Sequence, residues 1–81
     1  MNKKANYYLD ISNDLCPITL VKTKLAIEKM QSGDTLEVRL RGHEPIRNIP
    51  LSVQELGHSI LYLTPELKST SGIHKLYIRK N

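Results

Sequence analysis

The stretch TLEVRLR, residues Thr35–Arg41, alternates apolar and charged side chains along its whole length. A period of two residues is typical of a β-strand that has one face in the core and the other in solvent. In such a strand Leu36, Val38 and Leu40 face inward, and the charged residues between them face outward. Helices can then cover only one face of the sheet that contains this strand. The stretch therefore predicts a two-layer protein.

Three further segments have the pattern of strands. Residues 7–12 and residues 73–79 alternate in the same way, and residues 59–64 form a denser apolar run. The polar residues 65–72 are expected to link the last two strands as a hairpin loop. The residues predicted to face inward in the two alternating segments are Tyr7, Leu9, Ile11, Leu76 and Ile78.

Two helices are predicted between these strands. The first covers residues 17–31, with Pro17 at the first helical position, where the missing N–H costs nothing. The second covers residues 45–56, and Pro50 inside it predicts a break followed by a restarted helix. The order β-α-β-α-β-β gives an α/β (α+β) two-layer sandwich, in which a four-stranded mixed sheet carries both helices on one face. We expect residues 1–81 to form a single domain.

The charge and the first residues of the chain limit the class of protein. The chain has 81 residues, with 12 Lys+Arg against 8 Asp+Glu, a formal charge of +4 that suits either nucleic acid or an acidic protein partner. Residues 1–6 lack the apolar region of a signal peptide, and no apolar run is long enough to span a membrane. We expect a cytoplasmic protein without membrane association. A single cysteine agrees, because it forms no internal disulfide and a reducing compartment keeps it a thiol.

The first predicted helix has apolar residues on two sides. The side expected to pack on the sheet consists of Leu20, Thr23, Ala26, Ile27 and Met30. Ile18, Val21 and Leu25 fall on the opposite side, bordered by Lys22 and Lys29, and we call these five residues the helix patch. One interpretation is that the helix tilts and buries their edges, or that they are scattered surface residues. The other is a site for partner binding, apolar in the middle and cationic at the rim, that begins one turn from Cys16.

Cys16 directly precedes Pro17 at the start of this helix. Free backbone N–H groups and the positive end of the helix dipole stabilise a thiolate there, so the expected thiol pKa lies below the free value of about 8.5. Asp14 opposes this effect, and the polar loop before the cysteine is expected to be exposed. A lone cysteine can equally be a small buried apolar residue. These local features alone leave both interpretations open.

The stretch LDISNDLCP, residues 9–17, resembles the signature of the TusA/SirA-like sulfur-carrier family. Members of this family have a Leu-Asp pair, a short loop, and then Cys-Pro-x-Pro opening a helix. The similarity continues through residues 30–38, 47–50 and 57–58 in the same order and spacing. The resemblance implies the β-α-β-α-β-β sandwich and matches Cys16 to the family's sulfur-accepting cysteine and Pro17 to the proline after it.

Three departures from the family pattern stand out. Thr19 replaces the second proline of the motif, and Asn13 replaces the glycine of the loop. Asn tolerates left-handed backbone angles, so that change is mild. Thr19 leaves the nucleophile intact but is expected to alter which partner docks. Residues 41–43, Arg-Gly-His, stand where the family commonly has acidic residues. These departures indicate a divergent branch with a different sulfur acceptor.

The resemblance implies a sulfur carrier with a persulfide intermediate on Cys16. A cysteine desulfurase or another persulfide donor supplies the sulfur, and a downstream acceptor protein removes it by thiol exchange. The end use implied is tRNA thiolation or sulfur delivery to a cofactor pathway. Having no second cysteine prevents resolution of the persulfide into an internal disulfide. Whether such a sulfurtransferase acts as an enzyme in its own right stays open.

A small basic module that binds RNA or protein through its open sheet face is the alternative. That face is predicted to carry Tyr8, Glu37, Arg39, Arg41, Lys75, Tyr77 and Arg79. Tyrosines among cations resemble RNA-binding sheets, although tyrosine also pairs well in ordinary strands. His43, His58 and His74 do not have the spacing of metal ligands. We expect no metal, no cofactor, no direct nucleic-acid binding, and a monomer.

Overall fold

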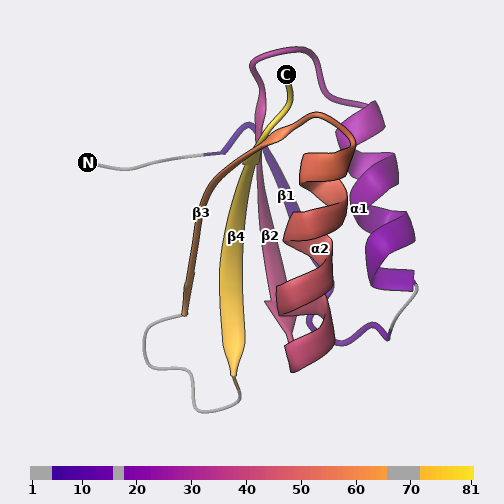
Figure 1. Cartoon of the computed structure of the whole chain (residues 1–81), viewed down its shortest axis with the longest axis vertical. Helices are drawn as coiled ribbons and strands as arrows, with labels where there is room; N and C mark the ends of the chain where they lie inside the picture. The colour runs from indigo at the N-terminus through magenta and orange to yellow at the C-terminus, as the bar shows by residue number, and fades with distance from the viewer. Residues whose placement is uncertain (1–4, 16–17, 66–71) are drawn as a thin grey trace.

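The computed structural model describes residues 5–15, 18–65 and 72–81, and its elements follow the predicted β-α-β-α-β-β order (Figure 1). The elements are β1 (Tyr7–Asp10), α1 (Ile18–Glu28), β2 (Thr35–Arg41), α2 (His43–Glu55), β3 (Ser59–Pro65) and β4 (Ile73–Arg79).

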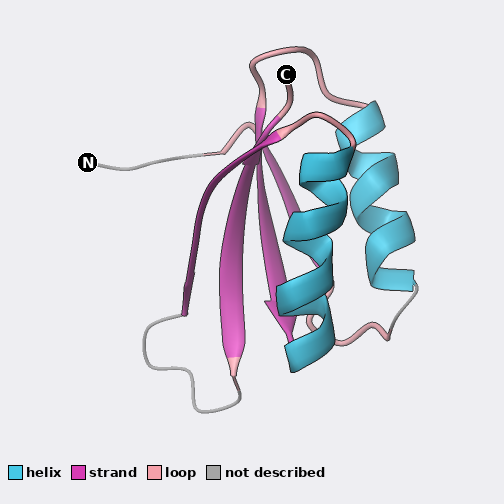
Figure 2. Ribbon diagram, viewed as in Figure 1, coloured by secondary structure: helices cyan, strands magenta, loops and turns pink. Residues whose placement is uncertain are grey.

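The strands form one mixed sheet in the order β1-β2-β4-β3. β1 pairs with β2 in parallel, and β4 pairs antiparallel with both β2 and β3. Both helices lie on the same side of this sheet (Figure 2), so the predicted two-layer sandwich is confirmed. The predicted inward face of β2 is confirmed, because Leu36, Val38 and Leu40 are fully buried while the residues between them are not.

The core lies between the helices and the two central strands. Its buried apolar residues are Ile11, Ile27, Met30, Leu36, Val38, Leu40, Ile49, Val53, Leu76 and Ile78. Two threonines of α1, Thr19 and Thr23, are also fully buried. The Thr23 hydroxyl donates to the Thr19 carbonyl at 2.8 Å, which satisfies this buried polar group within the helix itself.

The predicted break at Pro50 is wrong, because α2 runs without interruption from His43 to Glu55. Pro50 cannot donate the helical hydrogen bond to the carbonyl of Ile46. The helix persists because Pro45, Ile49 and Val53 are buried on one face, before and after the proline. Packing of that face against the sheet outweighs the local preference.

α2 also begins two residues earlier than predicted, since Gly42 precedes its first turn with φ of 103°. A side chain would be strained at this positive φ, so glycine allows the sharp turn from β2 into the helix.

α1 ends at Glu28, earlier than the predicted residue 31. The backbone N–H groups of Lys29 and Met30 donate to carbonyls three residues back, at 3.2 and 3.0 Å, so the helix closes in a tighter turn. Met30 nevertheless reaches the core and is 4% exposed. The predicted first residue, Pro17, lies outside the described residues.

Candidate functional site

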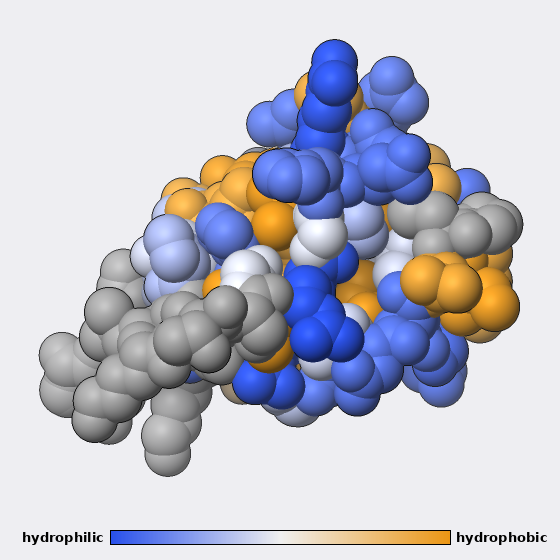
Figure 3. All heavy atoms as spheres, turned by 90° about the horizontal axis from the view of Figure 1, so that it is seen from below, coloured by the Kyte–Doolittle hydropathy of each residue, from blue (hydrophilic) through white to orange (hydrophobic). Residues whose placement is uncertain are grey.

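The structure places the described neighbours of the cysteine at one end of the molecule. Cys16 and Pro17 themselves lie outside the described residues. The loop after β1 and the start of α1 lie at the end where β1 and β2 finish and where both helices begin (Figure 1). Figure 3 looks onto this end and shows hydrophilic residues across its middle with apolar residues on either side. Two helix starts therefore direct their positive ends to the same region of the surface.

The loop that leads to the cysteine begins with a tight turn after β1. The backbone N–H and the hydroxyl of Ser12 both donate to the Asp10 carboxylate, at 2.9 and 2.6 Å. Arg39 on the neighbouring strand contacts the other carboxylate oxygen at 3.2 Å. The bonds from Ser12, with a smaller contribution from Arg39, hold the pKa of Asp10 below its ordinary value of 3.8. The ionised carboxylate fixes the direction in which the loop leaves the sheet.

Two side chains tie the next part of the loop to its surroundings. Arg41, the last residue of β2, donates from Nη2 to the Asn13 side-chain oxygen at 3.1 Å. Lys22, on the second turn of α1, contacts the Asp14 carboxylate at 2.8 Å. The sequence suggests that Asp14 opposes the acidity of the thiol, and the structure shows that Lys22 balances its charge. The loop is thus attached to both the sheet and the helix.

Leu15 joins this loop to the helix through its backbone. Its carbonyl accepts hydrogen bonds from the backbone N–H of Ile18 at 2.8 Å and of Thr19 at 3.2 Å. Its side chain, in contrast, is 79% exposed. The loop is polar overall in sequence, and its pattern alone does not distinguish Leu15. Its position directly before Cys16 is the signal that could have identified it.

The apolar residues of the helix patch lie outside the core. Ile18, Val21 and Leu25 are 52%, 50% and 52% exposed, and Lys22 and Lys29 are exposed beside them. Thr19 lies on the opposite side and is fully buried. Because Thr19 presents no side chain to a partner, any influence that it has on docking acts through the packing of α1.

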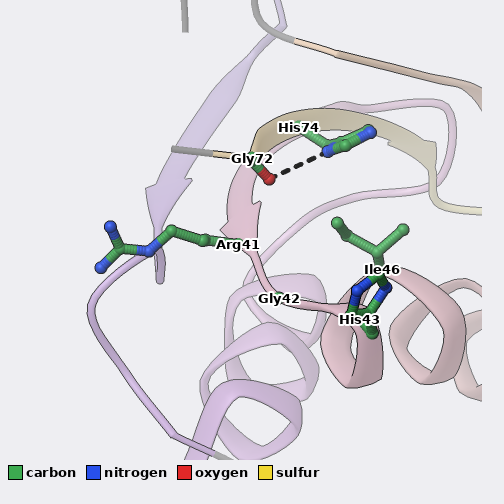
Figure 4. Close-up of a pocket in the computed structure, with 6 residues that line it drawn as sticks. All are labelled: Arg41, Gly42, His43, Ile46, Gly72 and His74. Atoms are coloured by element: carbon green, nitrogen blue, oxygen red, sulfur yellow. Dashed lines mark hydrogen bonds between the residues drawn. The ribbon is translucent and has the colours of Figure 1, made fainter. Parts of the chain in front are cut away.

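A cleft of about 420 Å³ opens beside the loop, between the end of β2, the start of α2 and the start of β4. It is lined by Arg41, Gly42, His43, Ile46, Gly72 and His74. Figure 4 shows that His43 and Ile46 lie on one side of the β2 end, while the Arg41 side chain points away. The ring Nδ1 of His74 lies 3.1 Å from the Gly72 carbonyl, which orients that ring.

Three residues of this cleft, Arg41, Gly42 and His43, also line a second hollow that reaches the loop before Cys16. This hollow measures about 350 Å³ and is lined by Asp14, Leu15, Arg41, Gly42, His43, Glu44 and Pro45. The fold thus brings the divergent residues 41–43 next to the loop that leads to Cys16. Within the described part of the chain, no group of three or more His, Cys, Asp or Glu residues is arranged to hold a metal ion.

A protein-family model described as "Sulfurtransferase TusA" matches residues 7–80, which is nearly the whole chain and includes its one cysteine. The chain belongs to the TusA family. The resemblance seen in the motif around Cys16 is thereby confirmed.

Several similar proteins are described as sulfur carriers. A protein of Archaeoglobus fulgidus named "Putative sulfur carrier protein" is 46% identical over 59 residues, which cover 72% of this chain and 66% of that protein. A Thermotoga maritima protein of the same name is 38% identical over 53 residues, covering 65% of this chain and 67% of that protein. The matched regions thus span about two thirds of these relatives. The Escherichia coli protein YedF, with the same description, is 34% identical over 60 residues, covering 74% of this chain and 78% of that protein.

The TusA-family fold is also seen in a solved structure. The crystal structure of a SirA-like protein from Desulfitobacterium hafniense superposes with a TM-score of 0.73, covering 90% of this chain and 95% of that one. At 19% sequence identity, this similarity concerns the fold alone. Neither helix in the described ranges is long and apolar enough to cross a membrane.

The open sheet face of this TusA-family protein carries the predicted charged residues, but several of them are paired. Lys75 lies 3.9 Å from the Glu37 carboxylate, and the Tyr77 hydroxyl donates to Glu37 at 2.9 Å. Burial, followed by the bond to Glu37, raises the pKa of Tyr77. Tyr62 stacks on Tyr77 with ring centroids 4.4 Å apart. Since Asp10 also pairs with Arg39, this face is less cationic than its sequence indicates, which weakens the alternative of an RNA-binding sheet.

Proposed function

We propose that this protein carries sulfur as a persulfide on Cys16, which it accepts from a persulfide-bearing donor such as a cysteine desulfurase. The observation that carries the proposal is the match to the TusA family across residues 7–80, which contain the chain's single cysteine within the family's motif. The arrangement around that position supports it. The preceding loop is attached to the sheet and the helix, and two helices begin beside it.

The proposed transfer is an exchange between sulfur atoms. The Cys16 thiolate attacks the outer sulfur of the donor persulfide, and a new S–S bond forms on Cys16. The S–S bond of the donor breaks, and its cysteine leaves as a thiolate. The outer sulfur keeps its proton, so Cys16 then holds a persulfide without any external oxidant. A thiolate of the acceptor protein removes this sulfur in the same way and returns Cys16 to a thiolate.

The helix patch is the proposed docking site for these partners. Its apolar residues are half exposed, and Lys22 and Lys29 at its border favour a partner with an acidic rim. Reversing the charge of Lys29 would then slow association and weaken its dependence on salt, without affecting the fold. The acceptor feeds either tRNA thiolation or a cofactor pathway, and the single thiol suits the reducing cytoplasm.

Intact-mass spectrometry tests the central step. After incubation with a cysteine desulfurase and cysteine, the wild-type chain is expected to gain about 32 Da, the mass of one sulfur atom, and to lose it with a reductant. Cys16→Ser is the matched control and gains nothing. Failure of the wild-type chain to gain sulfur from several purified persulfide donors would refute the proposed function.

A further inference from the structure

Leu15 combines an exposed side chain with a fixed backbone. At 79% it has the largest exposed fraction among the large apolar residues in the described ranges. Loop residues with such exposure are commonly free to move. Leu15 instead holds the first turn of α1 through two backbone hydrogen bonds, and the Asp14–Lys22 pair fixes the residue before it. The backbone of Leu15 is therefore fixed, while its apolar side chain is exposed to solvent.

The position of Leu15 also extends the helix patch. The carbonyl of Leu15 accepts from the N–H of Ile18, so these residues lie one turn apart. Val21 and Leu25 follow Ile18 at intervals of three and seven residues, which place them on one stripe of the helix. Leu15, directly before Cys16, thus lies one turn ahead of this stripe in the chain. Scattered apolar residues on a surface need no explanation, but exposed apolar residues spaced one turn apart that lead up to the reactive residue do.

We infer that Leu15 is an anchor residue that inserts into an apolar pocket of the sulfur-donating protein. This inference rests on the proposed function and adds a description of the partner. The donor protein has an apolar pocket beside its persulfide, and acidic residues surround that pocket. Apart from Lys22, which pairs with Asp14, the exposed charged residues of α1 and its end are Lys24, Glu28 and Lys29, and their net positive charge gives the charge complementarity. Adjacent Cα atoms lie about 3.8 Å apart, so a donor that binds the Leu15 side chain has Cys16 as the next residue along the chain.

An anchor that is already ordered is efficient, because little conformational freedom is lost when the partner binds. Buried apolar anchors near the centre of an interface commonly contribute most of its affinity, while residues at the rim contribute little. Leu15 therefore determines how tightly the donor binds, whereas Cys16 performs the chemistry. The expected effect of removing the Leu15 side chain is on KM and Kd, with little change in kcat.

The experiment compares four chains with a purified cysteine desulfurase. Leu15→Ala keeps the backbone carbonyl that caps α1 and is expected to weaken binding, with Kd and the KM for transfer both rising about tenfold or more. Leu15→Met retains a flexible apolar side chain and restores most of the affinity. Leu51→Ala, on α2 with 53% exposure, is the matched control and behaves like the wild-type chain. Thermal melts and the rate of Cys16 alkylation by iodoacetamide are expected to agree among all four.

Each result has a defined meaning. If the wild-type chain gains sulfur and Leu15→Ala shows the same Kd and KM, the anchor is refuted while the proposed function stands. A fall in iodoacetamide reactivity equal to the fall in transfer would also refute the anchor, because Leu15 would then act on the thiol. A wild-type chain that gains no sulfur from the desulfurase or from other purified persulfide donors would overturn both proposals.

Discussion

The two sides of α1 predict opposite responses to substitution at neighbouring positions. Leu25 is 52% exposed in the helix patch, and Ile27, two residues later, is 2% exposed in the core. Leu25→Glu is expected to leave the fold intact and to impair sulfur transfer. Ile27→Ala is expected to destabilise the domain.

The magnitudes follow from burial. Substitution at an exposed helix position usually changes the free energy of unfolding by less than about 0.5 kcal/mol, and the new carboxylate would lie four residues before Lys29, a favourable spacing. Removing a buried isoleucine side chain costs about 2–5 kcal/mol. For a domain of this size, about 4–8 °C of Tm corresponds to 1 kcal/mol. Leu25→Glu should therefore shift Tm by no more than about 4 °C, and Ile27→Ala should lower it by at least about 8 °C.

Thermal melts by circular dichroism measure the stability, and transfer from a loaded desulfurase measures the function. A carboxylate in the middle of an apolar interface is expected to raise the KM for transfer about tenfold or more. If Leu25→Glu melts as early as Ile27→Ala, the helix patch belongs to the core and our assignment of the two sides fails. If Leu25→Glu accepts sulfur with the same KM as the wild-type chain, the helix patch has no role in docking.

Two further predictions concern the loop and α2. Asp10→Asn removes a carboxylate whose pKa is lowered by Ser12 and Arg39. The carboxylate stabilises the fold above the pKa that it has in the unfolded chain, and this stability is lost as the pH falls through its pKa in the folded chain. The urea midpoint of the wild-type chain should therefore fall more steeply between about pH 5 and about pH 2 than that of the variant, and parallel curves would contradict this. Pro50→Ala restores an N–H that can donate to the Ile46 carbonyl, and the gain, offset by a more flexible unfolded chain, should raise stability by about 1 kcal/mol. A lower Tm would show that packing of the half-buried proline ring matters more than the missing hydrogen bond.

The sequence by itself determined the fold, because its patterns are regular where packing demands them. The alternation in β2 required one buried face, and that face is occupied by Leu36, Val38 and Leu40 as predicted. The motif around Cys16 was likewise specific enough to indicate the family, which the match over residues 7–80 confirms.

Where the sequence prediction failed, a local preference was outweighed by tertiary packing. Pro50 favours a break, but burial of Ile49 and Val53 on both sides of it keeps α2 continuous. Thr19 stands in place of the motif's second proline, and only packing shows that α1 turns it into the core. A sequence gives the preference of each residue, whereas the outcome depends on the free energy of the whole buried face.

The surroundings of the candidate site were decided only by the tertiary structure. Asp14 and Lys22, eight residues apart, form an ion pair because the loop folds back along α1. Arg41 and Asn13, 28 residues apart, meet because β1 and β2 are parallel neighbours. Leu15 is distinguished by its exposure, which depends on what the rest of the chain leaves uncovered. Periodicity assigns a residue to a face of its own element, but contacts between distant segments and the uncovered surface arise only when the elements pack together.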